Sequence, residues 1–180
     1  MKFIAFIRGI NVGRKNRIKM ADLVKALDLL GLKNIRTYLQ SGNVTFEHDN
    51  FDNTNISRDI KRKISQVFGI SVNVIIRRED ELETIIELNP FIKDHDIEPS
   101  KLHVTYLKEI PDKDLILNLG QFKGKNEDLK VNNKEIYLYL PNGYAKTKLT
   151  NEFFEKKLKT IATTRNWKTT TKILEIAKYD

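Results

Sequence analysis

A loop with two glycines and a basic end follows the first apolar segment of the chain. Gly9 and Gly13 enclose three residues, and Arg14 and Lys15 come directly after them. A Walker phosphate loop has four residues between its glycines, then Lys, then Ser or Thr to hold magnesium, so this loop departs from that motif. Backbone N–H groups at a glycine turn before a helix still favour phosphate or carboxylate, and Arg8 and Lys15 add positive charge. The pattern indicates either an anion cradle or only a tight connection shaped by its glycines.

A second polar loop, Gln40 to Asn43, lies between two predicted strands. Ser, Gly and Asn are ordinary turn residues, so turn formation alone can explain it. The alternative interpretation is that Gln40, Ser41 and Asn43 contact a ligand. If the predicted strands 3–7 and 35–40 run parallel, as a split β-α-β unit requires, this loop and the first one lie at the same edge of the sheet.

A third polar group opens the last predicted helix. Asn166 is a good residue to cap the start of that helix, and Trp167 can fill the core beneath it. The alternative is that Arg165 clamps an anion with Trp167 as a stacking wall. Lys146 and Lys148, which precede the helix before it, can join such a site.

Several kinds of catalytic site are missing from the sequence. The chain has no cysteine, which excludes disulfides and thiolate chemistry and fits a cytoplasmic location. Its three histidines share no ligand spacing, so we expect no metal ion, and nothing indicates a cofactor. There is no Gly-x-Ser-x-Gly elbow, and Ser41 has no neighbouring base. The sequence leaves open whether any reaction is catalysed.

Positive charge is concentrated at the two ends of the chain. The net charge is +8, with +7 in residues 1–46, −4 in residues 47–145 and +5 in residues 146–180. These ends either have solvated basic faces or meet to form a surface that attracts anions. No apolar stretch is long enough to span a membrane, and we expect no membrane partner.

The periodicity of apolar residues predicts an α+β fold. In the first half, apolar runs and alternation predict strands, and three- and four-residue spacing predicts helices, in the order β-α-β-β-α-β. This is the order of a ferredoxin-like unit, and a further helix at 81–88 closes it. The predicted strands are 3–7, 35–40, 44–47 and 72–77, and the helices before 81–88 are 20–30 and 56–68.

The second half repeats this order. Strands are predicted at 102–107, 129–132 and 135–140, and helices begin near Pro111, Thr150 and Trp167. No apolar run predicts a fourth strand here, so the second unit is expected to end in a helix instead of a strand. We therefore predict two ferredoxin-like β-α-β-β-α units in tandem, divided into segments 1–92 and 93–180 and packed as one globular protein.

Six segments of the chain together form a recognisable pattern: Arg8-Gly9-Ile10-Asn11-Val12-Gly13, Thr37 to Phe46, Asn89-Pro90-Phe91, Tyr139 to Gly143, Thr147-Lys148-Leu149 and Ala162 to Thr169. In these segments the chain resembles the bacterial "domain of unknown function 1697" family, and the resemblance covers essentially its whole length. Arg14, where the family usually has a second glycine, and Thr147, where serine is commoner, are departures. The resemblance implies an α+β fold with ferredoxin-like units and implies no activity.

Three functions are compatible with these observations. The favoured one is binding of a small anionic ligand, including a phosphorylated one, in a hollow shared by both basic ends of the chain. A nucleic-acid-binding module with Tyr38, Tyr137 and Tyr139 as stacking residues is the second, although the RNA-recognition motif of strand three is absent. The third is a self-associating protein that uses a sheet edge. The predicted ligand contacts are Arg8, Asn11, Lys15, Gln40, Ser41, Asn43, Lys148, Arg165, Asn166 and Trp167.

Overall fold

The computed structural model describes residues 1–13, 15–49 and 52–179. Its contacts divide the chain into two compact units: unit 1 consists of Met1–Thr84 and Lys172–Asp180, and unit 2 of Ile85–Thr171. The sequence instead places the division after residue 92, and the division into segments 1–92 and 93–180 stays a prediction. Within the described ranges, no helix has the length and apolar composition needed to cross a bilayer.

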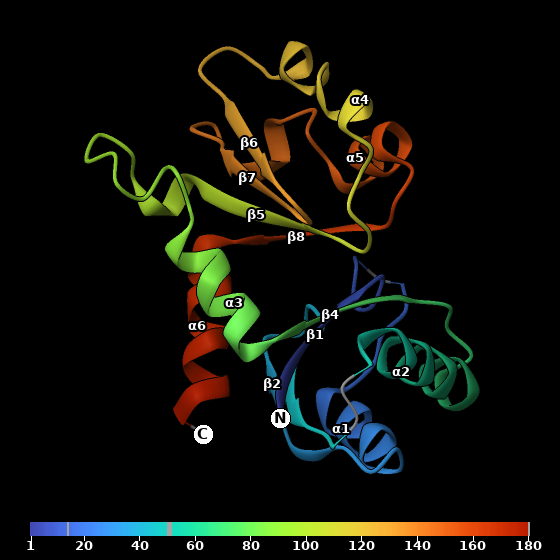
Figure 1. Ribbon diagram of the computed structural model, residues 1–180. Helices are drawn as coiled ribbons and strands as arrows, with labels where there is room; N and C mark the ends of the chain where they lie inside the picture. Colours follow the sequence, from blue (N-terminus) through green and yellow to red (C-terminus); the bar gives the residue numbers. More distant parts are fainter. Residues whose placement is uncertain (14, 50–51, 180) are drawn as a thin grey trace. The chain divides into compact units, whose positions relative to one another are not determined.

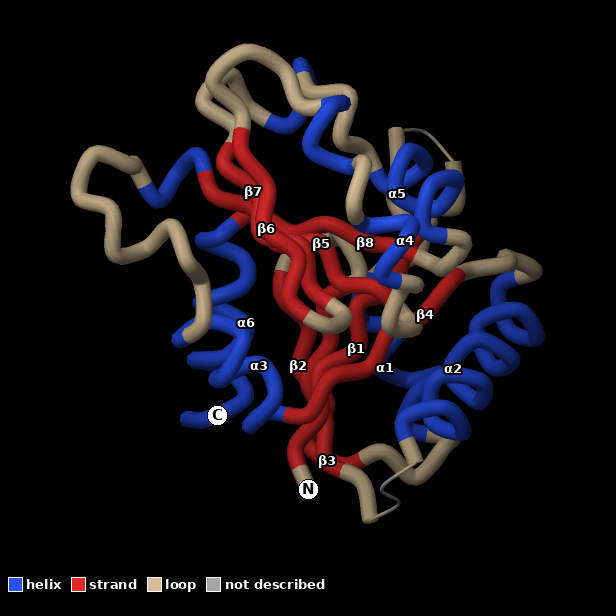
Figure 2. Tube along the Cα trace, turned by 45° about the horizontal axis from the view of Figure 1, so that its top comes forward, coloured by secondary structure: helices blue, strands red, loops and turns tan. Residues whose placement is uncertain are grey.

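Unit 1 contains a four-stranded antiparallel sheet in the order β2-β3-β1-β4. Figure 1 labels β1, β2 and β4, and Figure 2 also labels β3. β1 and β2 each run antiparallel to β3 and are therefore parallel to each other, as the predicted split β-α-β arrangement requires. The elements are β1 (Lys2–Arg8), α1 (Met20–Asp28), β2 (Lys33–Tyr38), β3 (Asn43–Glu47), α2 (Asn53–Phe68), β4 (Asn73–Arg78) and α3 (Glu79–Glu87).

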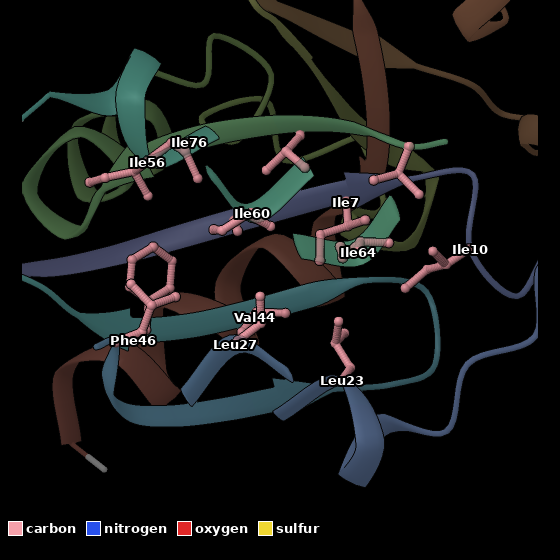
Figure 3. Packing of buried hydrophobic residues seen from close by; sticks show 14 of the residues in the cluster. Ile7, Ile10, Leu23, Leu27, Val44, Phe46, Ile56, Ile60, Ile64 and Ile76 are labelled. Atoms are coloured by element: carbon pink, nitrogen blue, oxygen red, sulfur yellow. The ribbon is translucent and has the colours of Figure 1, made fainter. Parts of the chain in front are cut away.

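The core of unit 1 lies between one face of this sheet and the helices α1 and α2. Isoleucines at four-residue spacing give α2 one apolar stripe, and alternate residues of β1 face it. The Asp52 side chain accepts hydrogen bonds from the N–H groups of Thr54 and Asn55, which starts α2, and the left-handed Gly69 ends it. Figure 3 shows this cluster, with Leu23 and Leu27 of α1 and Ile60 and Ile64 of α2 near Ile7 and Val44.

Unit 2 contains a second four-stranded antiparallel sheet, in the order β6-β7-β5-β8. Its core forms with α4 and α5 and is centred on residues such as Leu138, Leu149 and Phe154. The elements that follow α3 are β5 (Leu102–Leu107), α4 (Lys113–Ile116), β6 (Asp128–Asn132), β7 (Glu135–Tyr139), α5 (Asn151–Leu158), β8 (Ala162–Asn166) and α6 (Trp167–Tyr179), with 3-10 turns at Pro99–Lys101, Leu119–Phe122 and Tyr144–Lys146. The part of α6 from Lys172 onward is counted with unit 1.

The predicted fold class is confirmed, with one correction in unit 2. The sequence predicts a helix in place of the last strand, but β8 pairs with β5 over its whole length before α6 begins. The segment Ala162–Asn166 contains three polar residues between its ends and no apolar alternation. Threonine nevertheless favours strands, and pairing with the buried β5 determines the conformation here. Both units therefore have the complete order β-α-β-β-α-β-α.

The strand registers correspond residue by residue between the pairs β1–β3 and β5–β7 and between the pairs β1–β4 and β5–β8. Ile4 lies opposite Arg77 on β4, and Val104 lies opposite Arg165 on β8. When Ile4 is equated with Val104, the Ile7 N–H bond to the Gly42 carbonyl matches the Leu107 N–H bond to the Lys134 carbonyl, and both are 2.7 Å. Equivalent positions of the two units can therefore be compared directly.

Candidate functional site

The first candidate site is the edge of the unit 1 sheet where β1 and β2 end and β3 begins. Asn43 lies opposite Phe6 on β1 and opposite Tyr38 on β2, so the loops after both strands leave from the same edge. This confirms that loop 9–19 and turn 39–42 lie together. The loop is anchored in the core at both ends by Ile10 (Figure 3) and Ile18, which leaves residues 12–17 largely exposed where they are described.

Asn11 holds the two loops together. Its Nδ2 donates to the Gln40 carbonyl at 2.8 Å and to the Ile18 carbonyl at 3.0 Å. Its Oδ1 accepts from the Ile18 N–H at 2.8 Å, and its own N–H donates to the Asn16 carbonyl at 2.9 Å. Both amide hydrogens of Asn11 are thus used within the protein, so this side chain determines the shape of the loop.

The side chain of Asn43 stabilises turn 39–42 through hydrogen bonds. This side chain is fully buried, and its Nδ2 donates to the Tyr38 carbonyl and to the Ser41 hydroxyl, both at 3.0 Å. A Cβ at Gly42 would lie 2.4 Å from the Ile7 carbonyl oxygen, and Gly42 has φ +77°. Only glycine allows the turn to approach β1 this closely.

Left-handed backbone conformations are frequent in these two loops. Leu39 has φ +58° although it is a large residue, and 55% of its surface is exposed. Such a conformation is unfavourable for a leucine and is kept only where its surroundings impose it, which is common at functional sites. Gly9, Asn11, Gly13, Asn16 and Gly42 also have positive φ values.

Arg8 and Lys15, two positively charged residues at this edge of the sheet, differ in their burial. Arg8 is half-buried at the end of β1, opposite Asn73, whereas Lys15 is exposed. Gln40 and Ser41 are exposed on the turn. Arg14, the departure from the family glycine, lies outside the described residues.

In unit 2, Arg165 lies on β8 with its guanidinium turned back along the strand. Its Nη1 donates to the Thr163 hydroxyl at 2.8 Å and to the Thr164 carbonyl at 2.9 Å. Burial lowers the pKa of Arg165 to about 10, so the group is still a cation at neutral pH. Because side chains alternate along a strand, Arg165 and Asn166 lie on opposite faces of the sheet.

The other predicted residues of unit 2 occupy different structural positions. Asn166 accepts a hydrogen bond from the Thr169 N–H at 2.8 Å, which confirms that it caps α6. Trp167 is buried, with 7% of its surface exposed. Lys148 is exposed, two residues before Thr150, which caps α5. The sequence therefore grouped residues that the sheet divides between its two faces.

Arg77 and Glu127 are among the buried charged residues that sequence reasoning missed. Arg77, the unit 1 equivalent of Arg165, is 5% exposed and donates to the Ile76 carbonyl at 2.9 Å. Glu127 is 8% exposed and accepts from the Gly124 N–H at 2.7 Å and from the Thr147 hydroxyl at 3.0 Å. The Thr147 departure therefore keeps the hydroxyl that serine has. No local pattern distinguishes either charged residue from an exposed one.

Two of the tyrosines considered for base stacking make contacts inside the protein. Tyr137 is 1% exposed and donates its hydroxyl to the Ile85 carbonyl at 2.9 Å. The Tyr139 ring lies 6.4 Å from the Phe91 ring. Tyr38 is half-buried at the end of the edge strand β2.

The predicted hollow combines Arg8 of unit 1 with Arg165 of unit 2, and it stays a prediction. In the parts of the chain that the structure describes, no three His, Asp or Glu side chains lie close enough together to hold a metal ion.

Comparison with known proteins gives a family and a fold. The family model described as "Protein of unknown function (DUF1697)" matches residues 1–137. The structure of the conserved bacterial protein SP0830 from Streptococcus pneumoniae is similar, with a TM-score of 0.77 and 23% identity over 98% of each chain. At this identity the likeness shows the fold alone. No curated protein matches the chain.

Proposed function

Since the chain belongs to the DUF1697 family of proteins of unknown function, we propose a function from the site itself: unit 1 binds a small anionic ligand at the edge formed by loop 9–19 and turn 39–42. Arg8, Lys15, Gln40 and Ser41 contact the ligand. Asn11 and Asn43 keep their amide hydrogens within the loops and position the contacting residues. Phosphorylated small molecules are the best chemical match, and no reaction is part of the proposal.

The observation that carries this proposal is the difference between the two units at this edge. In unit 2 the connection from β5 to α4 takes only residues 108–112, and β6 and β7 are joined by residues 133–134. The same strand-to-turn hydrogen bond is made there with the shorter turn. The fold therefore does not require the longer loops of unit 1, and a binding role is a sufficient reason for their presence.

Charge and backbone conformation support an anion as the ligand. Residues 8–19 contain five Lys or Arg and no Asp or Glu. Successive residues with left-handed and right-handed backbone turn their N–H groups toward one side, which is a common way to hold phosphate oxygens. Arginine adds planar, paired donors that suit the same oxygens.

The two alternatives make different predictions. A nucleic acid would contact several phosphates, so its affinity would fall steeply with salt, whereas a small ligand at one site would lose far less. Self-association would appear in gel filtration as a concentration-dependent size. A cytoplasmic location belongs to the proposal because phosphorylated metabolites and cysteine-free proteins both fit that compartment.

Calorimetric titration of the full chain with pyrophosphate tests the proposal. We expect binding, a loss of about fivefold in affinity for Lys15→Gln, corresponding to about 1 kcal/mol, and no change for Lys25→Gln. Lys25 is an exposed lysine on α1 of the same unit, so it controls for net charge. A parallel titration with single-stranded RNA over a salt series tests the second function. The absence of pyrophosphate binding, or an equal loss in both lysine variants, would contradict the proposed site.

A further inference from the structure

A second polar cluster occurs in unit 2 at positions where unit 1 is apolar. Thr105 and Thr164 lie opposite each other on β5 and β8, and His103 precedes Thr105 on the same face of the sheet. Their unit 1 equivalents, by the register of the two sheets, are Ala5, Ile76 and Phe3, and all three belong to the hydrophobic core. The fold thus accepts apolar residues at these positions, and unit 2 has polar ones.

The polar residues form a directed chain of hydrogen bonds that ends on α5. The Thr164 hydroxyl donates to Asn151 Oδ1 at 2.8 Å. Because that hydroxyl has one hydrogen, the 2.7 Å contact between the Thr105 and Thr164 hydroxyls must be donated by Thr105. The chain therefore fixes the orientation of the Asn151 amide, with its oxygen toward Thr164 and its NH₂ group away from it.

The same orientation is imposed on Asn166. Its Oδ1 accepts from the Thr169 N–H, so its NH₂ group also points away from its hydrogen-bonded side. Asn166 lies on the same face as Thr164, two residues further along β8, about 7 Å away. Two uncharged amide groups, on the half-buried Asn151 of α5 and the exposed Asn166 of β8, are thus oriented by their oxygens on one side of the sheet.

Aromatic side chains and a lysine lie next to the polar residues of this cluster. The His103 ring, opposite Asn166 in the strand register, stacks at 5.6 Å on the Tyr144 ring. The Asn151 N–H donates to the Tyr144 hydroxyl at 3.2 Å, and Thr150 accepts from the Phe153 N–H. Because these N–H groups at the start of α5 are already bonded, the donors of the cluster are side chains. Lys148 lies beside them in sequence as an exposed cation.

We propose that this cluster, defined by His103, Thr105, Asn151, Thr164 and Asn166, is a second binding site, which takes the carboxylate or phosphate group of a small molecule. The oriented NH₂ groups of Asn151 and Asn166 donate to its oxygens, and Lys148 supplies charge. Thr105 and Thr164 act through Asn151 as positioning residues. This site uses none of the residues of the loop edge in unit 1.

The test is a titration of the ¹⁵N-labelled full chain with inorganic phosphate and, separately, with acetate, followed through the side-chain NH₂ signals of asparagine. We expect the signals of Asn151 and Asn166 to shift with at least one anion at millimolar concentrations. The double variant Thr105→Ala/Thr164→Val reproduces the apolar pattern of unit 1 and should reduce the affinity at least fivefold without unfolding the protein.

Further variants separate this site from the one in unit 1. Asn166→Ser keeps an oxygen that caps α6 but removes the NH₂ group, and it should weaken binding by a similar factor. Lys15→Gln should leave the Asn151 and Asn166 shifts unchanged. Failure of these two signals to respond to either anion, or an unchanged affinity in the double variant, would overturn the second site and leave the loop-edge proposal untouched. Shifts scattered over the whole surface would show an adventitious ion only and would overturn it as well.

Discussion

Replacement of Gly42 by alanine tests how closely the turn of unit 1 must approach the sheet. The new Cβ would lie 2.4 Å from the Ile7 carbonyl oxygen and 3.0 Å from Ile7 Cβ, and both belong to the buried central strand. The left-handed conformation alone costs about 1 kcal/mol for a residue with a Cβ. Relief of the clash must also break the 2.7 Å bond from the Ile7 N–H to the Gly42 carbonyl, which adds about 1 kcal/mol, and it disturbs the packing of Ile10. We expect a total loss of about 3 kcal/mol.

Gly31→Ala is the matched control for this prediction. Gly31 has φ +75°, close to that of Gly42, but a Cβ added there would have no other atom within 4 Å. It should therefore show only the conformational cost, about 1 kcal/mol. Urea unfolding followed by circular dichroism measures both, and with a slope of about 2 kcal/mol per molar the two midpoints should differ by about 1 M. Equal midpoints would refute the argument that contact with β1, rather than backbone conformation, requires the glycine.

Three other changes test particular contacts. Asn11→Ala removes the bonds to the Gln40 and Ile18 groups, so it should cost about 2 kcal/mol in urea unfolding and weaken pyrophosphate binding although no charge is lost. Burial lowers the pKa of His103 below its usual 6.5 in the folded protein. Between these two pKa values the unfolded chain binds more protons than the folded one, so the free energy of unfolding falls as the pH decreases. The urea midpoints of His103→Phe should therefore lose this part of the pH dependence. Asp52→Ala removes the cap of α2 and should cost about 1 kcal/mol, with loss of helical signal as the check.

Local patterns in the sequence were sufficient for most of the fold because the patterns and the packing agree. The apolar run of β1 and the four-residue spacing of α2 each have one physical interpretation, and the structure has it. β8 was missed because its residues are polar, and its conformation comes from pairing with β5, which is distant in sequence. β2 ends at Tyr38 rather than at Gln40, since Leu39 adopts a left-handed conformation that no leucine predicts.

The sequence predicted that loop 9–19 and turn 39–42 lie at one edge of the sheet, but it did not predict the contacts within them. Parallel strands β1 and β2 brought the two loops to one edge, as topology alone requires. The sequence could not show that Asn11 reaches the Gln40 carbonyl, 29 residues away, or that Asn43 is buried. Similarly, alternation along a strand separates Arg165 from Asn166, and this could be deduced only once the strand itself was known.

Because the two units share one architecture, equivalent positions in them can be compared for features that stability does not require. The two units have the same strand order and the same register around their central strands β1 and β5, but each contains a feature that lowers stability and that the other lacks. Unit 1 has a longer loop with a strained Leu39, where unit 2 has a short connection. Unit 2 has a buried hydroxyl at Thr105, where unit 1 has Ala5. Burying a polar group stabilises a protein no better than an apolar side chain that fills the same space. Stability therefore explains neither departure, and both are consistent with the separate binding sites that we propose for the two units.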